Sequence, residues 1–208
     1  MDSRDFVDGL VRDVTERQHH RDRERRIPDG DAGELPDFVV RHWLNFAVYY
    51  ERAAVTFIGG WLRTTREADA VVHLAHQVED EANHYMWLGR HLTELGGNLS
   101  SFEPPQPWRS LMDDYYPGLE HLVDRLAAHN IASETGALGF MEFNLSRFPV
   151  GIRGTVESVI ADEKYHLAFG RTLLEKYCTT PELQARATRA AGEAIDRMRA
   201  ARETFVQI

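Results

Sequence analysis

The sequence predicts an all-α fold, a bundle of long helices, and three observations lead to it. Apolar residues recur three and four positions apart through most of the chain, which is the period of an amphipathic helix. No segment alternates apolar and polar residues with the period of two that a half-buried strand requires. The two helical halves are separated by a proline-rich stretch that holds Pro104, Pro105, Pro107 and Pro117. We therefore expect two helical hairpins joined by a crossover.

The first helix of the first hairpin is expected to have Pro36 in its first turn and to end at Leu62. The second helix of this hairpin follows directly. It is predicted from Thr64, because Thr64 and Glu67 have the spacing of a capping box, and it stops at Gly96. Almost no loop remains between the two helices, so they must be antiparallel neighbours.

An extended crossover is predicted over residues 98–117, because its prolines interrupt any continuous helix. A third helix is predicted over residues 118–148, and Pro149 with the glycines that follow indicates a tight turn. The fourth helix is expected to end near Cys178. A shorter fifth helix, polar on most of its faces, is expected over residues 181–205.

The 208 residues suit one domain, and we divide them into a charged lead-in over residues 1–34 and a helical domain over residues 35–208. Residues 21–33 are expected to form a solvated stretch that ends in a turn. Phe6, Leu10 and Val14 recur at helical spacing in the lead-in. A short amphipathic helix is therefore expected to dock on the main body.

Composition narrows the classes of function. The formal net charge of −9 argues against a nucleic-acid-binding surface, and the 43% hydrophobic and 27% charged residues favour a globular protein over a membrane one. The single cysteine, Cys178, excludes an internal disulfide and any four-cysteine iron site, and it fits a reducing compartment. The first residues are charged where a secretory signal would be apolar. We therefore expect a cytoplasmic protein with no nucleic-acid or membrane partner.

Two Glu-x-x-His motifs interrupt the apolar stripes of predicted helices, with both members of each motif on one face because they are three residues apart. Each is preceded by an aspartate. The motifs are Asp80-Glu81-Ala82-Asn83-His84 and Asp162-Glu163-Lys164-Tyr165-His166. A third pair, Glu16 and His19, lies in the charged lead-in with no apolar face to interrupt, and we interpret it as a chance occurrence.

The preceding helix of each hairpin adds one more carboxylate on its apolar face, Glu51 in the first and Glu134 in the third. Glu51 and Glu81 each lie roughly 20 Å of helix from the turn that joins them, at 1.5 Å per residue, so they should reach the same depth. The two Glu–Glu intervals are 30 and 29 residues, from Glu51 to Glu81 and from Glu134 to Glu163. The two hairpins therefore present equivalent sets.

Six such groups inside an apolar bundle would be very costly as bare charges, and no lysine or arginine lies on the same stripes. Two divalent ions would balance four carboxylates, and mixed Glu and His donors suit first-row metals, iron first among them. The predicted ligands are Glu51, Glu81, His84, Glu134, Glu163 and His166. A polar core network without metal is the alternative.

Three further positions bear on the site. Glu142 is the rival of Glu134, but it lies further round the helix and breaks the symmetry of the intervals, so we assign it at most a supporting role. Gln77, one turn before Glu81, could bond a ligand carboxylate or could be merely a half-buried polar residue. The tyrosines next to ligands in sequence are expected to point off the site face. They are Tyr49, Tyr50 and Tyr165.

The order Glu, Glu-x-x-His, Glu, Glu-x-x-His resembles that of the ferritin-like di-iron carboxylate superfamily, and the resemblance covers roughly residues 36–178. It implies a four-helix bundle that holds two iron ions, or iron with manganese, and uses dioxygen as co-substrate. The aspartates are similar to the superfamily's metal-supporting aspartates. This implies that Asp162 accepts a hydrogen bond from His84 and that Asp80 accepts one from His166.

The run at residues 162–170 is similar to the oxygenase branches, such as aldehyde-deformylating and phenylacetyl-CoA-epoxidase-type proteins. The resemblance thus favours a non-haem di-iron oxygenase or oxidase that oxidises a small organic substrate with an external electron donor. Ferritin- or peroxidase-type iron handling is the main alternative, although one cysteine excludes a rubredoxin-bearing version. A radical-generating subunit is a third class. Bundles of this type often pair through a helical face, so a homodimer is expected.

Overall fold

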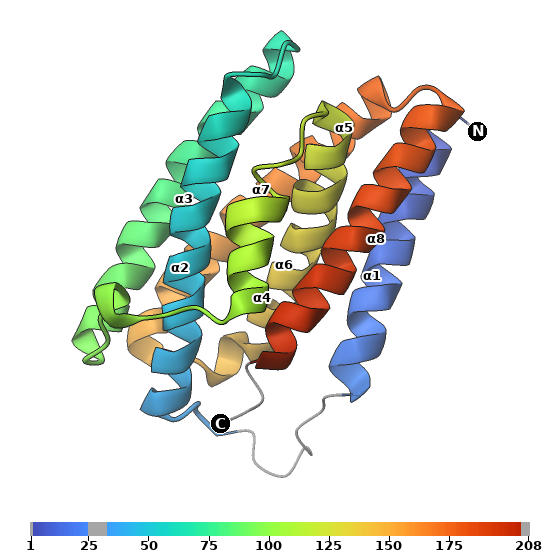
Figure 1. Ribbon diagram of the computed structural model, residues 1–208. Coiled ribbons are helices and arrows are strands. Elements are labelled where there is room, and N and C mark those ends of the chain that lie inside the picture. The colour runs from blue at the N-terminus through green and yellow to red at the C-terminus, as the bar shows by residue number, and fades with distance from the viewer. Residues whose placement is uncertain (1, 25–32, 205–208) are drawn as a thin grey trace.

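A computed structural model describes residues 2–24 and 33–204, and every regular element within these ranges is a helix. The all-α prediction is confirmed. Figure 1 shows the long helices lying side by side along one direction, with short connections at both ends. None of the described helices has both the length and the apolar character that a membrane span requires.

Two helical hairpins make up most of the bundle. The first joins α2 (Asp37–Leu62) to α3 (Ala68–Glu94), and the two helices pack along their length. The second joins a composite helix to α7 (Val150–Tyr177), with Pro149 preceding α7. In chain order the composite helix consists of α5 (Leu122–Arg125), η3 (Leu126–Ser133), α6 (Glu134–Asn144) and η4 (Leu145–Arg147).

The η3 segment is a π-helix, in which the backbone bonds five residues back, and all of its residues are buried. Residues five positions apart therefore lie above one another in this segment, whereas an α-helix places them about 140° apart. This change of period comes directly before Glu134. It alters which side chains of the composite helix face the interior.

The second helix begins later than predicted. Glu67 caps α3 with extended backbone and makes no side-chain capping bond, so the predicted capping box from Thr64 is wrong. The Thr64 hydroxyl instead donates to the carbonyl of Trp61 at 3.2 Å and accepts from the Arg125 guanidinium at 2.7 Å. The hydroxyl therefore bonds the last turn of α2 and links it to Arg125 of the composite helix.

The crossover is more helical than predicted. After η1 (Leu99–Ser101) the chain forms α4 (Gln106–Arg109), which continues into η2 (Ser110–Tyr115). Pro107 falls in the first turn of α4, where its missing N–H costs no hydrogen bond. Leu111 and Met112 are buried against the bundle, so the second half of the crossover is part of the core.

Two further helices cover the bundle. The helix expected in the lead-in is present as α1 (Ser3–Glu24), which buries Val7, Leu10 and Val14 and packs on α6, α7 and α8. Of the solvated stretch predicted over residues 21–33, residues 21–24 continue α1, and residues 25–32 lie outside the described residues.

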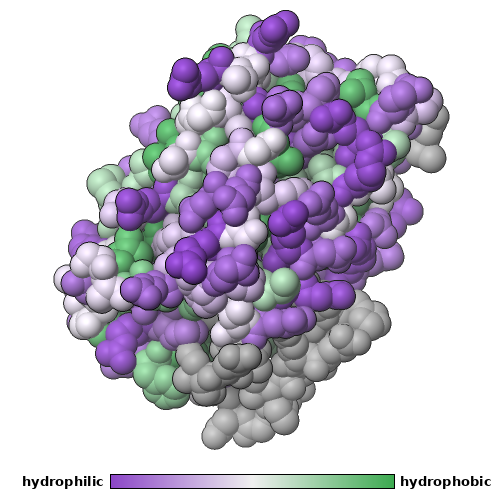
Figure 2. Space-filling model, in the orientation of Figure 1, coloured by the Kyte–Doolittle hydropathy of each residue, from purple (hydrophilic) through white to green (hydrophobic). Residues whose placement is uncertain are grey.

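The last helix, α8 (Pro181–Glu203), is polar on most of its faces, as predicted, but it also has one buried face. It lays a buried stripe against η3, and the stripe consists mainly of alanines, which carry little hydrophobic signal in the sequence. The outer face matches the expectation. In the view of Figure 2, hydrophilic residues cover most of the surface of α8 and α1, and apolar residues are scattered.

The buried apolar residues form two clusters, one toward each end of the bundle. Along α2, Val48 belongs to one cluster and Ala54 to the other, and Glu51 lies between them. Along α3, Leu74 and Leu88 are separated in the same way around Glu81. A polar layer thus crosses the middle of the core.

Candidate metal centre

The six predicted ligands meet in this polar layer. Each has an exposed fraction of 5% or less. They come from four helical segments, two in each hairpin, and are Glu51 of α2, Glu81 and His84 of α3, Glu134 of α6, and Glu163 and His166 of α7. These residues lie within packed helices, so their backbones are already fixed. Little ordering of the protein is therefore needed when a metal ion binds.

The donor atoms form two groups, each able to hold a metal ion. In one group, atoms of Glu51, Glu81, His84 and Glu163 all lie within 4.8 Å of one another, and in the other, atoms of Glu81, Glu134, Glu163 and His166 do so. Glu81 and Glu163 belong to both groups. The arrangement therefore offers two adjacent cation positions with two shared carboxylates, and each position has one imidazole.

Each imidazole is oriented by an aspartate from the opposite motif, as the resemblance implies. The Nε2 atom of His84 lies 3.1 Å from Asp162, and the Nε2 atom of His166 lies 3.1 Å from Asp80. These hydrogen bonds cross between α3 and α7 and place the proton on Nε2, so both Nδ1 atoms face the glutamates. The Nδ1 atom of His166 lies 2.9 Å from Glu163.

Four oxygen and nitrogen atoms of the cluster that could ligate a metal lack a hydrogen-bond partner among the described residues. They are buried, and they are Oε2 of Glu51, Oε2 of Glu81, Nδ1 of His84 and Oε2 of Glu134. An unsatisfied buried polar atom costs about 1–3 kcal/mol, and more when the group is charged. All four point into the cluster, where a cation would satisfy them together. The residues present therefore fit a metal ion.

Protons balance the charge of the cluster when no cation does. Burial, and next the charges of Glu81 and Glu163, raise the pKa of Glu51 well above its usual value. Burial also raises that of Glu134. Burial alone would lower the pKa of His84, but the contact of its Nδ1 atom with the Glu81 carboxylate at 3.3 Å outweighs this and raises the pKa to about 9. The pKa of His166 is raised to about 9 by the corresponding contacts with Glu163 and Glu81, against the effect of burial.

Gln77 bonds two of the cluster carboxylates, which resolves the alternatives for this residue. Its Nε2 atom donates to Glu81 and to Glu134, at 3.0 Å each, and its side chain is fully buried. The Gln77 oxygen accepts from Asn130 at 2.9 Å, so the orientation of the amide is fixed. Gln77 therefore holds carboxylates of both hairpins in place.

His129 and Tyr50 join the same network, although the sequence did not indicate either of them. The Nδ1 atom of His129 lies 3.3 Å from Glu134, and its Nε2 atom bonds the Tyr50 hydroxyl at 3.0 Å. Burial lowers the pKa of His129 to about 4, so its imidazole is neutral near pH 7. The prediction that Tyr50 points off the site is wrong. His129 was missed because five-residue spacing from Glu134 aligns only in the π-helical segment.

The other candidates lie away from the cluster. Glu142 is half exposed and forms an ion pair with Lys164 at 2.6 Å, so it is not a rival ligand. Tyr49 and Tyr165 point away as predicted, toward Asp113 and His73 respectively. The third Glu-x-x-His pair lies on α1, and the side chain of its histidine is outside the described residues.

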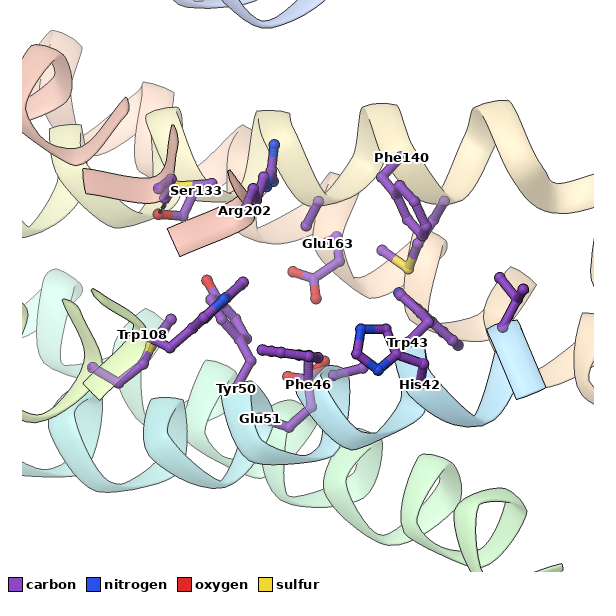
Figure 3. Close-up of a pocket in the computed structure, with 16 residues that line it drawn as sticks. His42, Trp43, Phe46, Tyr50, Glu51, Trp108, Ser133, Phe140, Glu163 and Arg202 are labelled. Carbon is purple, nitrogen blue, oxygen red and sulfur yellow. Dashed lines mark hydrogen bonds between the residues drawn. The ribbon is translucent and has the colours of Figure 1, made fainter. Parts of the chain in front are cut away.

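A cavity of about 340 Å³ opens beside the cluster, between α2 on one side and α6, α7 and α8 on the other. In Figure 3, Glu51 and Glu163 reach its middle from opposite sides, and Tyr50 lies next to them. Most of the remaining lining is apolar. Its apolar residues are Val39, Trp43, Phe46, Ala47, Trp108, Met112, Ala137, Phe140, Met141 and Met198.

Comparison with protein-family models finds none that matches the chain, and comparison with curated proteins finds no relative either. What the site can do is therefore argued from its own atoms. They offer nitrogen and oxygen donors for metal, a buried location, and access to a small apolar space.

Proposed function

We propose that this chain is a non-haem di-iron oxygenase or oxidase with a ferritin-like bundle, which uses dioxygen to oxidise a small organic substrate. The observation that carries the proposal is the pair of cation positions that share Glu81 and Glu163 and adjoin an apolar cavity. Structural metal sites do not need such a cavity, whereas a site that oxidises a bound molecule does.

The ferritin-like assignment is supported by the equivalence of the two hairpins. Each contributes one glutamate from its first helix and a Glu-x-x-His pair from its second, at the same level of the bundle. This is the inward-facing ligand arrangement of helical di-iron carboxylate proteins. The additional helices α1 and α8 cover the second hairpin and leave that arrangement intact.

The donor set supports iron as the metal. Four carboxylates and two imidazoles suit divalent first-row ions, while calcium and magnesium sites rarely use histidine and structural zinc sites favour cysteine. Manganese in one of the two positions is compatible with the same donors. When bound, iron supplies the capacity to bind and reduce dioxygen.

The chain's own residues perform the remaining tasks. Asp80 and Asp162 hold the imidazoles with Nδ1 facing the cluster, and Gln77 holds Glu81 and Glu134. The apolar cavity walls exclude water and place an organic molecule against Glu51 and Glu163. Insertion of one oxygen atom of dioxygen needs two further electrons, so an external electron donor is part of the proposal.

Metal stoichiometry provides the first test. The purified chain, loaded with Fe(II) under anaerobic conditions and then desalted, is expected to retain about two irons, one for each donor group. Retention of none, after loading at neutral pH, would contradict the proposal.

Iron storage is the competing function, and excess iron distinguishes it. With iron well beyond two equivalents under air, an oxygenase is expected to keep about two irons per chain and to consume dioxygen faster when an apolar organic compound is present. Retention of hundreds of irons per assembly, with no response to organic compounds, would show storage instead.

A further inference from the structure

We propose that the cavity binds an uncharged, mostly apolar organic molecule of about two fused rings, and that it discriminates against anions of the same size. The inference rests on the proposed function, in which this molecule is the substrate class. It is carried by three features of the cavity: its volume, the state of its polar groups and a lining ring that reaches the surface.

The volume sets the size of the ligand. A buried apolar cavity of about 150 Å³ is enough to hold benzene. At about 340 Å³, this cavity has roughly twice that space. Two fused rings, or an aliphatic molecule of equal volume, would fill it, and a four-ring compound would not fit.

Two hydroxyl groups in the walls are engaged with the protein. The Ser133 hydroxyl donates to the carbonyl of Ala128 and contacts the Tyr116 hydroxyl, and the Tyr50 hydroxyl bonds His129. A polar substrate would therefore gain few new hydrogen bonds here while losing its own hydration. This favours a ligand with little polarity.

The charges around the cavity oppose an anion. Glu51 and Glu163 border its middle, and a carboxylate held there would compete with them for the same cations. Burial lowers the pKa of His42, which borders one end, so its imidazole is uncharged at neutral pH.

The one guanidinium in the described lining belongs to Arg202, at the α8 end of the cavity. It is directed toward the packed helices beside the cavity. A Cβ atom at Gly136 of α6 would lie 2.8 Å from Nη2 of Arg202 and 3.0 Å from Nε2 of Gln18 of α1. The positive charge therefore lies where α6, α1 and α8 meet, at the edge of the space that the ligand would fill.

Phe140 both lines the cavity and reaches the surface. This residue is 40% exposed, and its ring stacks on Trp43 with ring centroids 6.2 Å apart. Trp43 packs in turn against Phe148, which is fully buried. Phe140 is thus the exposed member of the pair, and we infer that the ligand enters past its ring, between α2 and α6.

Equilibrium dialysis of the full chain tests the inference with three probes: naphthalene, 2-naphthoate and pyrene. The chain is used both without added metal and loaded with Zn²⁺, which is redox-inert, so that no probe is consumed. One naphthalene is expected to bind per chain, with 2-naphthoate at least tenfold weaker and pyrene not bound. Binding of 2-naphthoate as tightly as naphthalene, or tighter, would overturn the charge argument and assign Arg202 an anchoring role.

Two variants of lining residues test whether naphthalene binds in this cavity. Ala47→Phe fills it from α2 and is expected to weaken naphthalene binding at least tenfold, whereas Ala185→Phe on the exposed face of α8 is the matched control and should not. Phe140→Ala removes a ring that lines the cavity, so it enlarges both the cavity and its entrance and is expected to admit pyrene. If Ala47→Phe does not fold, Phe140→Ala still decides, because continued exclusion of pyrene would overturn the role of this ring.

Metal content separates this inference from the proposed function. Two metals per chain without naphthalene binding would overturn the inference and leave the di-iron proposal in place. Naphthalene binding that Ala47→Phe removes, in a chain that binds no metal, would support the cavity assignment and remove its role as a substrate site.

Discussion

The two hairpins contribute the same residue types to the candidate metal centre, yet they hold them differently. Glu134 of the second hairpin accepts a hydrogen bond from Gln77 and lies beside His129, so one of its oxygens is fixed by the protein. In both glutamates the Oε2 atom has no hydrogen-bond partner among the described residues, but Glu51 of the first hairpin lines the cavity and Glu134 does not. A nearly symmetric sequence pattern therefore produces a centre with one anchored side and one side that faces the cavity.

The asymmetry originates in the backbone of the composite helix. Its π-helical segment aligns His129 with Glu134, and no π-helix precedes Glu51, which lies in the continuous α-helix α2. π-Helical turns inside α-helices frequently occur at functional sites. The difference predicts that substitutions on the two sides, and on the shared carboxylates, have unequal effects.

The largest effect is expected from the shared carboxylates. Glu163→Ala removes a metal ligand from both cation positions, so almost no metal should remain after desalting. Glu51→Ala removes a ligand from one position only and should leave about one metal per chain. Metal analysis by plasma emission measures both. Glu142→Ala, on the surface of the same bundle, is the control and should keep two metals. Full occupancy in Glu163→Ala would refute the shared role.

The aspartates should come next, because they act on the metal through the imidazoles. Asp162→Asn and Asp80→Asn are each expected to weaken metal affinity about 10–100-fold by loosening the orientation of His84 and His166 respectively. Competition with a chromophoric chelator measures this. Asp196→Asn, which changes an exposed aspartate on α8, should have no effect. Equal affinities in all three variants would contradict the positioning role.

Gln77→Leu should have a smaller and one-sided effect. It removes the hydrogen bonds to Glu81 and Glu134, so the affinity of the Glu134-side position should fall about tenfold. The Glu51-side position keeps Glu51 and His84 and should change less. Calorimetric titration with Zn²⁺ tests this, because two positions of unequal affinity fill in two separate steps. If the metal affinities of both positions fell equally, the distinction between an anchored side and a side that faces the cavity would be wrong.

Proton release gives the smallest signal and tests the charge balance. The pKa values of about 9 mean that His84 and His166 hold protons at pH 7 without a cation, and the raised pKa values of Glu51 and Glu134 favour the protonated forms of these carboxyls. Metal binding must displace these protons, so affinity should fall as the pH is lowered. Proton release on Zn²⁺ binding in weak buffer should be largest near pH 7. It should decrease toward about pH 9, where both imidazoles begin to lose their protons before metal binds. Release that does not depend on pH would show that the cluster is already deprotonated.

Much of this centre could be predicted from the sequence, because helical period and helix length are local properties. Six polar residues that interrupt apolar stripes at equal distances from two turns must meet if the helices pack as hairpins, and the structure brings them together. The crossed hydrogen bonds between each aspartate and the opposite histidine are also present.

The features that sequence reasoning missed depend on departures from the α-helical period or on tertiary partners. His129 reaches Glu134 only through a π-helical segment, for which the residues gave no signal. Thr64 does not cap α3 as predicted, because its hydroxyl accepts a hydrogen bond from Arg125, which lies 61 residues later in the chain. The packing of α8 was underestimated because its buried stripe consists largely of alanine.

The central claim is that this bundle holds two metal ions on shared carboxylates. Anomalous diffraction from crystals grown with iron tests it most directly, at the iron edge and just below it. We expect two iron peaks per chain, one next to Glu51 and His84 and the other next to Glu134 and His166, with Glu81 and Glu163 close to both. A single peak, or peaks only outside this cluster, would contradict it.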